Sequence, residues 1–271
     1  MNRAPFGRAV VNKRSLQYRG LRSLISPYLA PGLIGTGLLD PAANQIMDIH
    51  NLGVSYVYEP GFGTVWEFDG ADGNVESTVL GAGMGTCPKG PISYCWWCTK
   101  SSAGEAGLGR ILQQDGEVII YANGNNLDHT DYRWTGIDGG WSRTGAFPNS
   151  SIPKHFCITY DAVIAGAGPQ LYINGLFDGA MTETTAPTGT PTDIGGGQRR
   201  NVGNAFDSSS RTWDGRIWDV RIYAGVLQPA QVWRIFDQKT RFALYELFTR
   251  FFLSEMLSVL YISPFVASRR P

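Results

Sequence analysis

Short runs of β-branched and aromatic residues recur along the chain from about residue 32, and Gly, Asn or Asp bounds each of them. Runs of this length and composition are typical of β-strands joined by tight turns. The clearest are EVIIYAN, HFCITYDA and QLYINGLFDGAM. In the last of these, Asn174-Gly175 supplies the positive φ angles that a two-residue hairpin turn needs. Because almost no helical pattern precedes residue 228, the sequence predicts an all-β sandwich or jelly roll.

The last predicted strand is GRIWDVRIY, residues 215–223. Strict alternation divides it into two faces, and we expect its Asp and Arg side chains to be solvated. One face carries Ile217, Asp219 and Arg221, and the opposite face carries Arg216, Trp218, Val220 and Ile222. In LQPAQVWRIF, which follows, Pro229 suits a first helical turn and the apolar positions form one stripe. A single short helix is therefore predicted after the strands.

Composition agrees with this class, since 34 Gly, 15 Pro and only 17% charged residues suit many turns better than long helices. The formal net charge is zero, so no overall field favours nucleic acid as a partner. The charge is uneven, because residues 1–25 carry six basic side chains and no acidic one. We predict that residues 1–31 are a basic arm, either disordered or laid over a partner. Its candidate partner contacts are Arg3, Arg8, Lys13 and Arg14.

The C-terminal residues 241–271 are largely apolar and end in Arg269-Arg270-Pro271. A membrane-spanning helix needs about 20 apolar residues. The run from Phe251 to Val266 is shorter and contains Glu255 and Pro264, so no membrane span is predicted. We expect instead an apolar arm that docks onto a partner or another copy of the chain. Its candidate contacts are Leu244, Leu247, Phe248, Phe251 and Phe252.

The four cysteines, Cys87, Cys95, Cys98 and Cys157, form no dense framework. Cys95 and Cys98 have CxxC spacing, but they lie in a predicted strand, which places the two thiols on opposite faces. No second CxxC or nearby His completes a zinc set, so no metal site is predicted. The N-terminus also lacks the apolar run of a secretory signal, and we expect folding in a cytoplasm, where these residues stay thiols.

Three segments, HFCITYDA, PQLYINGLFDGAM and DGRIWDVRIYAGVLQPAQVWRIF, together resemble the laminin G-like, pentraxin-like branch of the concanavalin A-like jelly rolls. The resemblance covers roughly residues 32–240. It implies a jelly-roll sandwich of two antiparallel sheets with one short C-terminal helix. The predicted organisation is thus a basic arm (1–31), a jelly roll (32–240) and an apolar arm (241–271).

Catalytic motifs are absent from the sequence. Glycoside hydrolases of this fold resemble one another in a strand with Glu-x-Asp-x-x-Glu or a close variant, which pairs two carboxylates on one face. No predicted strand here carries such a pair, the three His are isolated, and no Gly-x-Ser-x-Gly occurs. We therefore predict no enzyme, no catalytic residue and no cofactor.

The resemblance implies one candidate ion, calcium, since relatives often bind it in loops at the rim of the sandwich. The candidate ligands are Asp69, Asp72 and Asn74, or Asp128 and Asp131. The alternative, which we favour, is turn chemistry in which Asp and Asn bond their own backbone.

Aromatic residues gather in the polar stretch NLDHTDYRWTGIDGGWSRTG. Tyr132, Trp134 and Trp141 could stack on a sugar ring, although aromatic residues suit a protein contact equally well. These three are the candidate ligand-binding residues.

The jelly roll combined with a tail of the TRFALYE type is also similar, more loosely, to virion proteins of tailed bacteriophages, such as capsid decoration or spike proteins. This similarity implies a non-enzymatic virion protein, assembled in the host cytoplasm. Its arms would grip other virion proteins or copies of itself while the jelly roll faces outward. The alternative is a carbohydrate-binding adhesin module that recognises a surface glycan.

Overall fold

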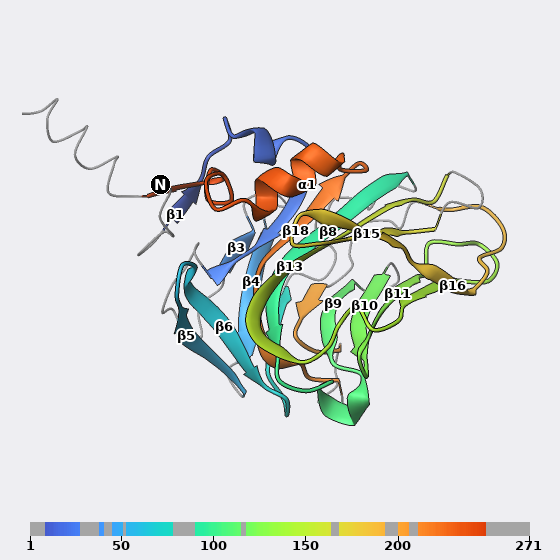
Figure 1. Ribbon diagram of the computed structural model, residues 1–271, viewed down its shortest axis with the longest axis horizontal. Helices are drawn as coiled ribbons and strands as arrows, with labels where there is room; N and C mark the ends of the chain where they lie inside the picture. The colour runs from blue at the N-terminus through green and yellow to red at the C-terminus, as the bar shows by residue number, and fades with distance from the viewer. Residues whose placement is uncertain are drawn as a thin grey trace, which may run out of the picture.

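The computed structural model describes residues 9–27, 38–40, 45–50, 53–77, 90–114, 118–163, 168–192, 200–205 and 211–247. They form two large antiparallel sheets packed face to face, with a third layer of terminal segments on one of them (Figure 1). The predicted all-β sandwich of two antiparallel sheets is confirmed.

The first sheet has nine strands in the order β16-β12-β11-β10-β9-β17-β7-β4-β3. We call it the nine-stranded sheet. Its strands are β16 (Thr182–Thr185), β12 (Gly139–Arg143), β11 (Asn126–Asp131), β10 (Val118–Asn123), β9 (Arg110–Gln114), β17 (Arg200–Val202), β7 (Asn74–Ser77), β4 (Gln45–His50) and β3 (Leu38–Asp40). A short 3₁₀ turn, η3 (Glu105–Gly107), precedes β9.

The second, eight-stranded sheet follows the order β15-β14-β13-β8-β18-β6-β5, and β2 pairs with β18 off this path. Its strands are β15 (Leu176–Ala180), β14 (Gln170–Ile173), β13 (Ser150–Asp161), β8 (Pro91–Lys100), β18 (Asp214–Ala224), β6 (Gly63–Asp69), β5 (Val54–Glu59) and β2 (Leu21–Ile25). The predicted hairpin joins β14 to β15, where Asn174 and Gly175 have φ of 51° and 78°.

The core between the sheets is aromatic and aliphatic. Strands of both sheets alternate, so that every second side chain is buried between them. Fully buried members include Trp66, Trp96, Trp213, Phe156 and Ile120. Trp96 and Phe156 stack with ring centroids 5.5 Å apart. Burial of this kind is the main stabilising term of the sandwich.

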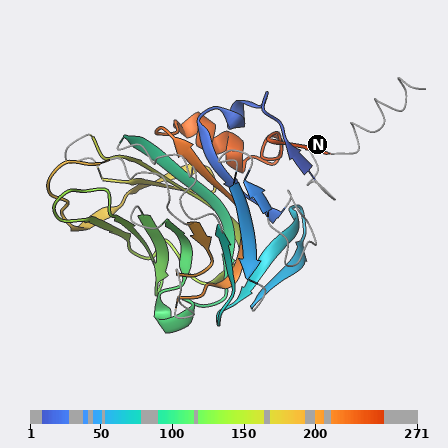
Figure 2. The same ribbon diagram turned by 180° about the vertical axis from the view of Figure 1, so that it is seen from behind.

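A second apolar cluster lies on the outer face of the eight-stranded sheet. Helix α1 (Pro229–Phe236), the 3₁₀ turn η1 (Leu16–Tyr18) and the paired strands β1 (Ala9–Val11) and β19 (Tyr245–Leu247) form this third layer. Figure 2 shows the N-terminal segment beside α1. Within this segment, η1 contacts α1. The layer buries Trp97 and Trp218 of the sheet under Val232 and Ile235 of the helix.

This layer changes the interpretation of the two arms. Residues 9–27 and 241–247 are parts of the folded unit rather than arms that order on a partner. Leu244, a predicted partner contact, is fully buried in the chain's own second cluster, so that prediction is wrong. Lys13 and Arg14 are exposed, and Leu247 lies in β19. The other predicted contacts, Arg3, Arg8, Phe248, Phe251 and Phe252, lie outside the described residues.

Strand β18 departs from strict alternation at Asp219, whose φ is +54°. The pairing to β8 shifts register between Trp218 and Arg221, which is a β-bulge. Ile217 faces the core before the bulge, and Val220 faces it afterwards. Asp219 and Arg221 therefore share the outer face under the third layer and are 3% and 0% exposed. The prediction that they are solvated is wrong, because the third layer covers this face of the sheet. The predicted division of the strand into two faces also fails, because the bulge brings Val220 onto the same face as Ile217.

The two cysteines of the CxxC segment do lie on opposite faces, as predicted. Cys98 is in the core between the sheets, and Cys95 is in the outer cluster, opposite Cys157 on β13. All three are free thiols, while Cys87 lies outside the described residues. In the part of the chain that the structure describes, no helix is long and apolar enough to cross a membrane.

Candidate functional site

The structure separates the three predicted ligand-binding aromatics. Tyr132, just after β11, is 37% exposed, and Trp134 is half-buried against the core. Trp141 in β12 is 3% exposed, with its ring 4.9 Å from that of Tyr160 and 5.6 Å from that of His129. Trp141 is therefore a core residue that cannot stack on a sugar, and its prediction is wrong.

Alternation in β11 explains why Tyr132 is accessible. Leu127 and His129 point into the sandwich, so Asp128, Thr130 and Tyr132 project from the outer face of the nine-stranded sheet. In β10 the inward positions are apolar, and Tyr121 projects outward beside Asp128, its partner in register.

Four outward residues on neighbouring strands form one row across this face. Tyr121 is paired in register with Arg110 of β9 on one side and with Asp128 on the other, and Asp128 is paired with Ser142 of β12. Directly opposite side chains on one sheet face lie about 5 Å apart at Cβ. We call Arg110, Tyr121, Asp128 and Ser142 the polar row; Tyr132 lies on the same face.

Arg110 occupies one end of the row. Its guanidinium carbon lies 4.5 Å from the centre of the Tyr121 ring, within the range of a cation–π contact. Its Nε is buried and donates to no acceptor in the described part of the chain. Burial lowers the pKa of Arg110, and the neighbouring Arg211 lowers it further, while Tyr121 and Tyr132 act in the opposite direction.

Asp128 lies on the other side of Tyr121 and is held in place by two donors. Its Oδ2 accepts from Nδ2 of Asn123 at 2.9 Å, and its Oδ1 accepts from the hydroxyl of Ser142. Burial raises the pKa of Tyr121, and the charge of Asp128 raises it further. The row therefore places an aromatic ring between a cation on one side and an ordered carboxylate on the other.

Asp131, named with Asp128 as a possible calcium ligand, has a different role. It is fully buried and accepts from Nε and Nη2 of Arg133 at 2.9 and 2.8 Å. A carboxylate engaged at both oxygens by a buried guanidinium is a structural ion pair. Asp128 and Asp131 thus point to opposite faces of the sheet and do not form one site.

The other calcium candidates lie in the turn after β6. Oδ1 of Asp69 accepts from the backbone N–H of Ala71 at 2.9 Å, which is the turn chemistry considered as the alternative. Asp69 also lines a groove of about 440 Å³ with Glu67, Asp214 and Ser101. Over the described residues, no group of three or more His, Cys, Asp and Glu side chains is placed to hold a metal ion.

Sequence reasoning did not single out Arg110 or Tyr121. Alternation along EVIIYAN places Tyr121 on the face opposite to Ile120, which was a usable signal. The pairing with Arg110 depends on the register between β9 and β10, which shifts at a bulge next to Tyr121. No pattern in the sequence indicates that register.

Among solved structures, several with this fold superpose on the chain at low identity. Domain 4 of AbnA, an extracellular GH43 arabinanase from Geobacillus stearothermophilus, was solved with arabinotriose and is 17% identical at a TM-score of 0.50. The match covers 80% of this chain and 98% of that one. The binding domain of Paraclostridial Mosquitocidal Protein 1 is 13% identical at a TM-score of 0.58, with 82% and 53% covered.

A third structure is the binding domain of botulinum neurotoxin DC in complex with SialylT, 14% identical at a TM-score of 0.55. The match covers 81% of this chain and 52% of the neurotoxin domain. The chain thus spans about half the length of each toxin binding domain. These identities show a common fold alone. No curated protein matches the sequence.

The family assignment comes from the sequence. A laminin G profile, described as "Concanavalin A-like lectin/glucanases superfamily", matches residues 69–233, more than half of the chain. The matched range begins at the end of β6 and ends in helix α1, so it includes the polar row and the closing strand β18. The chain therefore belongs to the concanavalin A-like lectin/glucanases superfamily, in agreement with the resemblance drawn from its motifs.

Proposed function

We propose that this protein is a non-catalytic carbohydrate-binding module whose ligand lies on the outer face of the nine-stranded sheet. The observation that carries the proposal is the polar row, in which Tyr121 lies between Arg110 and Asp128. An aromatic ring covers the apolar face of a pyranose, while a guanidinium and a carboxylate hydrogen-bond its hydroxyl groups. Tyr132 adds a second, more exposed ring on the same face.

The relatives give this proposal general support. One structure with the same fold contains arabinotriose and another contains SialylT. Fold likeness alone assigns no ligand, so the argument rests on the row itself.

The composition of the row supports binding rather than hydrolysis. A glycosidase needs two carboxyl groups about 5 to 9.5 Å apart. The row has a single carboxylate, Asp128, and both of its oxygens already accept hydrogen bonds. A screen of the wild-type protein for release of reducing sugar from polysaccharides is expected to show no turnover.

The binding proposal is tested by a glycan array followed by calorimetry on each hit. Tyr121→Ala and Tyr132→Ala should each weaken binding by about fivefold or more, because aromatic contacts of this kind are worth about 1 kcal/mol or more. Tyr58→Ala is the matched control, since Tyr58 is 60% exposed but lies on β5 of the other sheet. Absence of binding to every glycan, or equal loss in Tyr58→Ala, would remove support for the site.

We also propose a second role, in a virion, from the position of residues 9 and 247, where the described fold begins and ends. Ala9 of β1 is paired with Leu247 of β19, so segments 1–8 and 248–271 join the described fold at adjacent points. That pair lies in the third layer, beyond the eight-stranded sheet, and the polar row lies on the far sheet (Figure 1). A module anchored through its ends would present the row outward. We therefore propose a capsid decoration or spike protein of a tailed bacteriophage as the setting for this module.

The anchoring proposal needs truncations that spare the fold. Removing residues 1–8 or 248–271 deletes no described strand or helix, unlike removal of the whole predicted arms. Each truncated protein should lose association with virus particles in a sedimentation assay while its calorimetric unfolding transition persists. Particle association retained by both truncated proteins would rule out anchoring through these segments.

A further inference from the structure

Arg110 of the polar row has no carboxylate partner among the described residues, and this carries an inference about the ligand. We propose that the outer face selects acidic saccharides, and that Arg110 binds a carboxylate or sulfate group of the sugar. This inference rests on the proposed carbohydrate-binding function and adds a charge requirement to it.

Other arginines of the described fold show how this chain normally satisfies a guanidinium. Arg133 pairs with Asp131 at 2.8 Å and Arg221 with Asp219 at 2.6 Å, both fully buried. On the surface, Arg143 pairs with Asp178 at 2.8 Å. Arg110 is half-buried, yet within the described part of the chain no carboxylate pairs with it, and its buried Nε donates to nothing. Partial burial of a cation whose N–H has no acceptor costs free energy, and a ligand that supplies an acceptor would offset that cost.

The position of Arg110 over Tyr121 suits an incoming anion. Its guanidinium carbon lies 4.5 Å from the ring centre, so Tyr121 shields one side of the cation from water. The N–H groups of a guanidinium form a fixed planar fork that matches the two oxygens of a carboxylate or sulfate. An acidic sugar could therefore place its ring along the tyrosine and its charged group at the fork.

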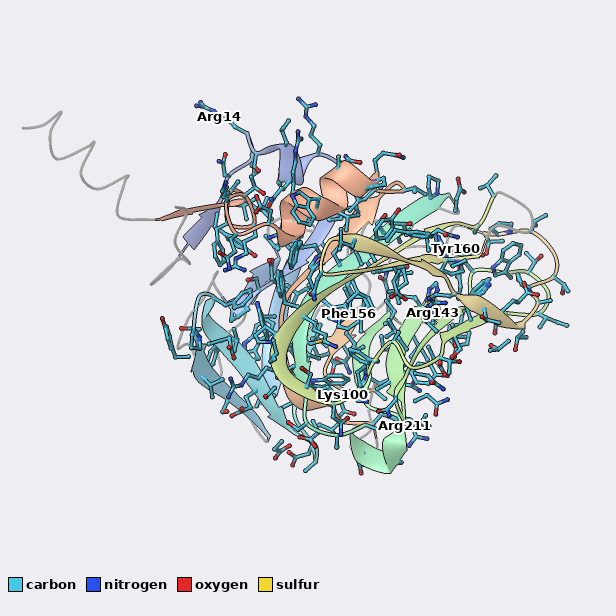
Figure 3. All side chains as sticks on the ribbon, viewed as in Figure 1. Arg14, Lys100, Arg143, Phe156, Tyr160 and Arg211 are labelled. Atoms are coloured by element: carbon cyan, nitrogen blue, oxygen red, sulfur yellow. The ribbon has the colours of Figure 1, made fainter. Side chains whose placement is uncertain are left out.

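The neighbouring charges favour one orientation of that sugar. Arg211 lies beside Arg110, since the backbone N–H of Arg110 donates to the carbonyl of Arg211 at 2.8 Å; Figure 3 labels Arg211 at the lower edge of the molecule. Asp128 lies on the opposite side of Tyr121 and already accepts from Asn123 and Ser142. The anionic group is thus attracted to the arginine end and repelled from the carboxylate end. Hydroxyl groups of the sugar are left to face Asp128.

The test compares saccharides that differ only in charge. The carboxylate arm uses oligogalacturonides and their methyl esters, and the sulfate arm uses carrageenan oligosaccharides and their desulfated forms. Calorimetry on the wild-type protein should give at least tenfold tighter binding of one acidic form than of its neutral form. That preference should diminish as salt is raised, because the contact is between charges.

Two variants assign the preference to Arg110. In Arg110→Gln the ratio of acidic to neutral affinity should fall close to one, and in Arg110→Lys it should recover only in part, because lysine keeps the charge but lacks the fork. Arg14→Gln, which removes an exposed arginine of the third layer, should leave the ratio unchanged (Figure 3).

The outcomes distinguish a failure of the charge preference from a failure of carbohydrate binding itself. Equal binding of acidic and neutral forms, or a preference that survives in Arg110→Gln, overturns the inference while carbohydrate binding stands. Binding of neither form, together with an empty glycan array, overturns both.

Discussion

Arg221 and Asp219 form a buried ion pair although only one residue separates them on the same strand. Nε and Nη2 of the arginine donate to the two carboxylate oxygens at 2.9 and 2.6 Å. Arg221 also donates to the side chain of Gln17 and to the carbonyl of Arg241, and the hydroxyl of Tyr245 donates to Asp219. Burial alone would lower the pKa of Arg221, but the charge of Asp219 outweighs it and raises that pKa. The pair thereby joins both ends of the described chain to the closing strand.

Loss of one member of this pair should be severely destabilising. Asp219→Asn keeps a residue that tolerates the positive φ but leaves the guanidinium of Arg221 buried without a counter-charge. We expect the free energy of unfolding to fall by about 3 to 5 kcal/mol, measured by urea denaturation. The double variant Asp219→Asn, Arg221→Met should be more stable than Asp219→Asn alone. If Asp219→Asn matches the wild type, the pair has no role in stability.

Two buried histidines should make the protein sensitive to mild acid. Burial lowers the pKa of His129 to about 4 and that of His155 to about 3. Asp131 opposes the shift at His129, whereas Arg133 adds to it, and Arg221 adds to the shift at His155. Neither ring has a hydrogen-bond partner within the described residues. Both therefore stay neutral in the folded chain over a range in which the unfolded chain binds protons.

The sign follows from the depressed folded-state pKa values. Stability from the neutral rings is complete above the unfolded pKa of about 6.5 and is lost as the pH falls towards 4 and 3. Each ring contributes about 1.4 kcal/mol per pH unit, so unfolding at pH 5 should cost about 4 kcal/mol less than at pH 7. His155→Phe should reduce that difference by about half. A pH-independent urea midpoint between 5 and 7 would contradict this account.

The N-terminal segment offers a matched pair of leucines. Leu24 in β2 is fully buried, while Leu16 in η1 is 51% exposed. Leu24→Ala should lower the unfolding free energy by about 2 to 5 kcal/mol, and Leu16→Ala should change it by about 0.5 kcal/mol or less. Equal, small effects at both positions would mean that the segment is an arm after all.

Trp141 and Tyr132 should respond to mutation in opposite ways. Trp141→Ala empties a large volume of core, and we expect a loss of about 3 to 5 kcal/mol in unfolding free energy. Tyr132→Ala should leave the thermal midpoint nearly unchanged while weakening glycan binding. Thermal denaturation of both variants beside the wild type measures the contrast. A stable Trp141→Ala protein that no longer binds would restore the interpretation drawn from the sequence.

The buried thiols should be unreactive in the native state. Burial raises the pKa of Cys98 and, with the neighbouring Cys95, that of Cys157. Since the thiolate is the reactive form, iodoacetamide should label neither residue until the protein unfolds. Peptide mass spectrometry with and without urea provides the measurement, and rapid labelling of the folded protein would show that this face opens.

Most of the fold was accessible from the sequence because alternation and turn chemistry are local. The Asn174-Gly175 hairpin and the opposite orientations of Cys95 and Cys98 needed only the period of a strand. The predicted faces of β18 were wrong because of a bulge, since a single extra residue at Asp219 exchanges the two faces of everything that follows. The prediction that Leu244 contacts a partner failed for another reason. Its burial depends on a third layer that packs against strands far away in sequence.

The candidate site was only partly predictable. An aromatic residue in a polar stretch is equally suited to a ligand, a partner or a core, and the structure gives Tyr132 an exposed position and Trp141 a buried one. The grouping of Arg110 with Tyr121 comes from register between strands. Register is determined by the whole sheet, so local patterns cannot indicate it.

The antiparallel pairing of Ala9 with Leu247 has a mechanical consequence. Force applied through these two positions would pull β1 and β19 apart sideways, so that their hydrogen bonds break one after another rather than together. The terminal pair should therefore open at low force, whereas the sandwich behind it keeps its long-range strand pairings. A protein held by both ends would yield first at its attachment and would keep its outer sheet face intact.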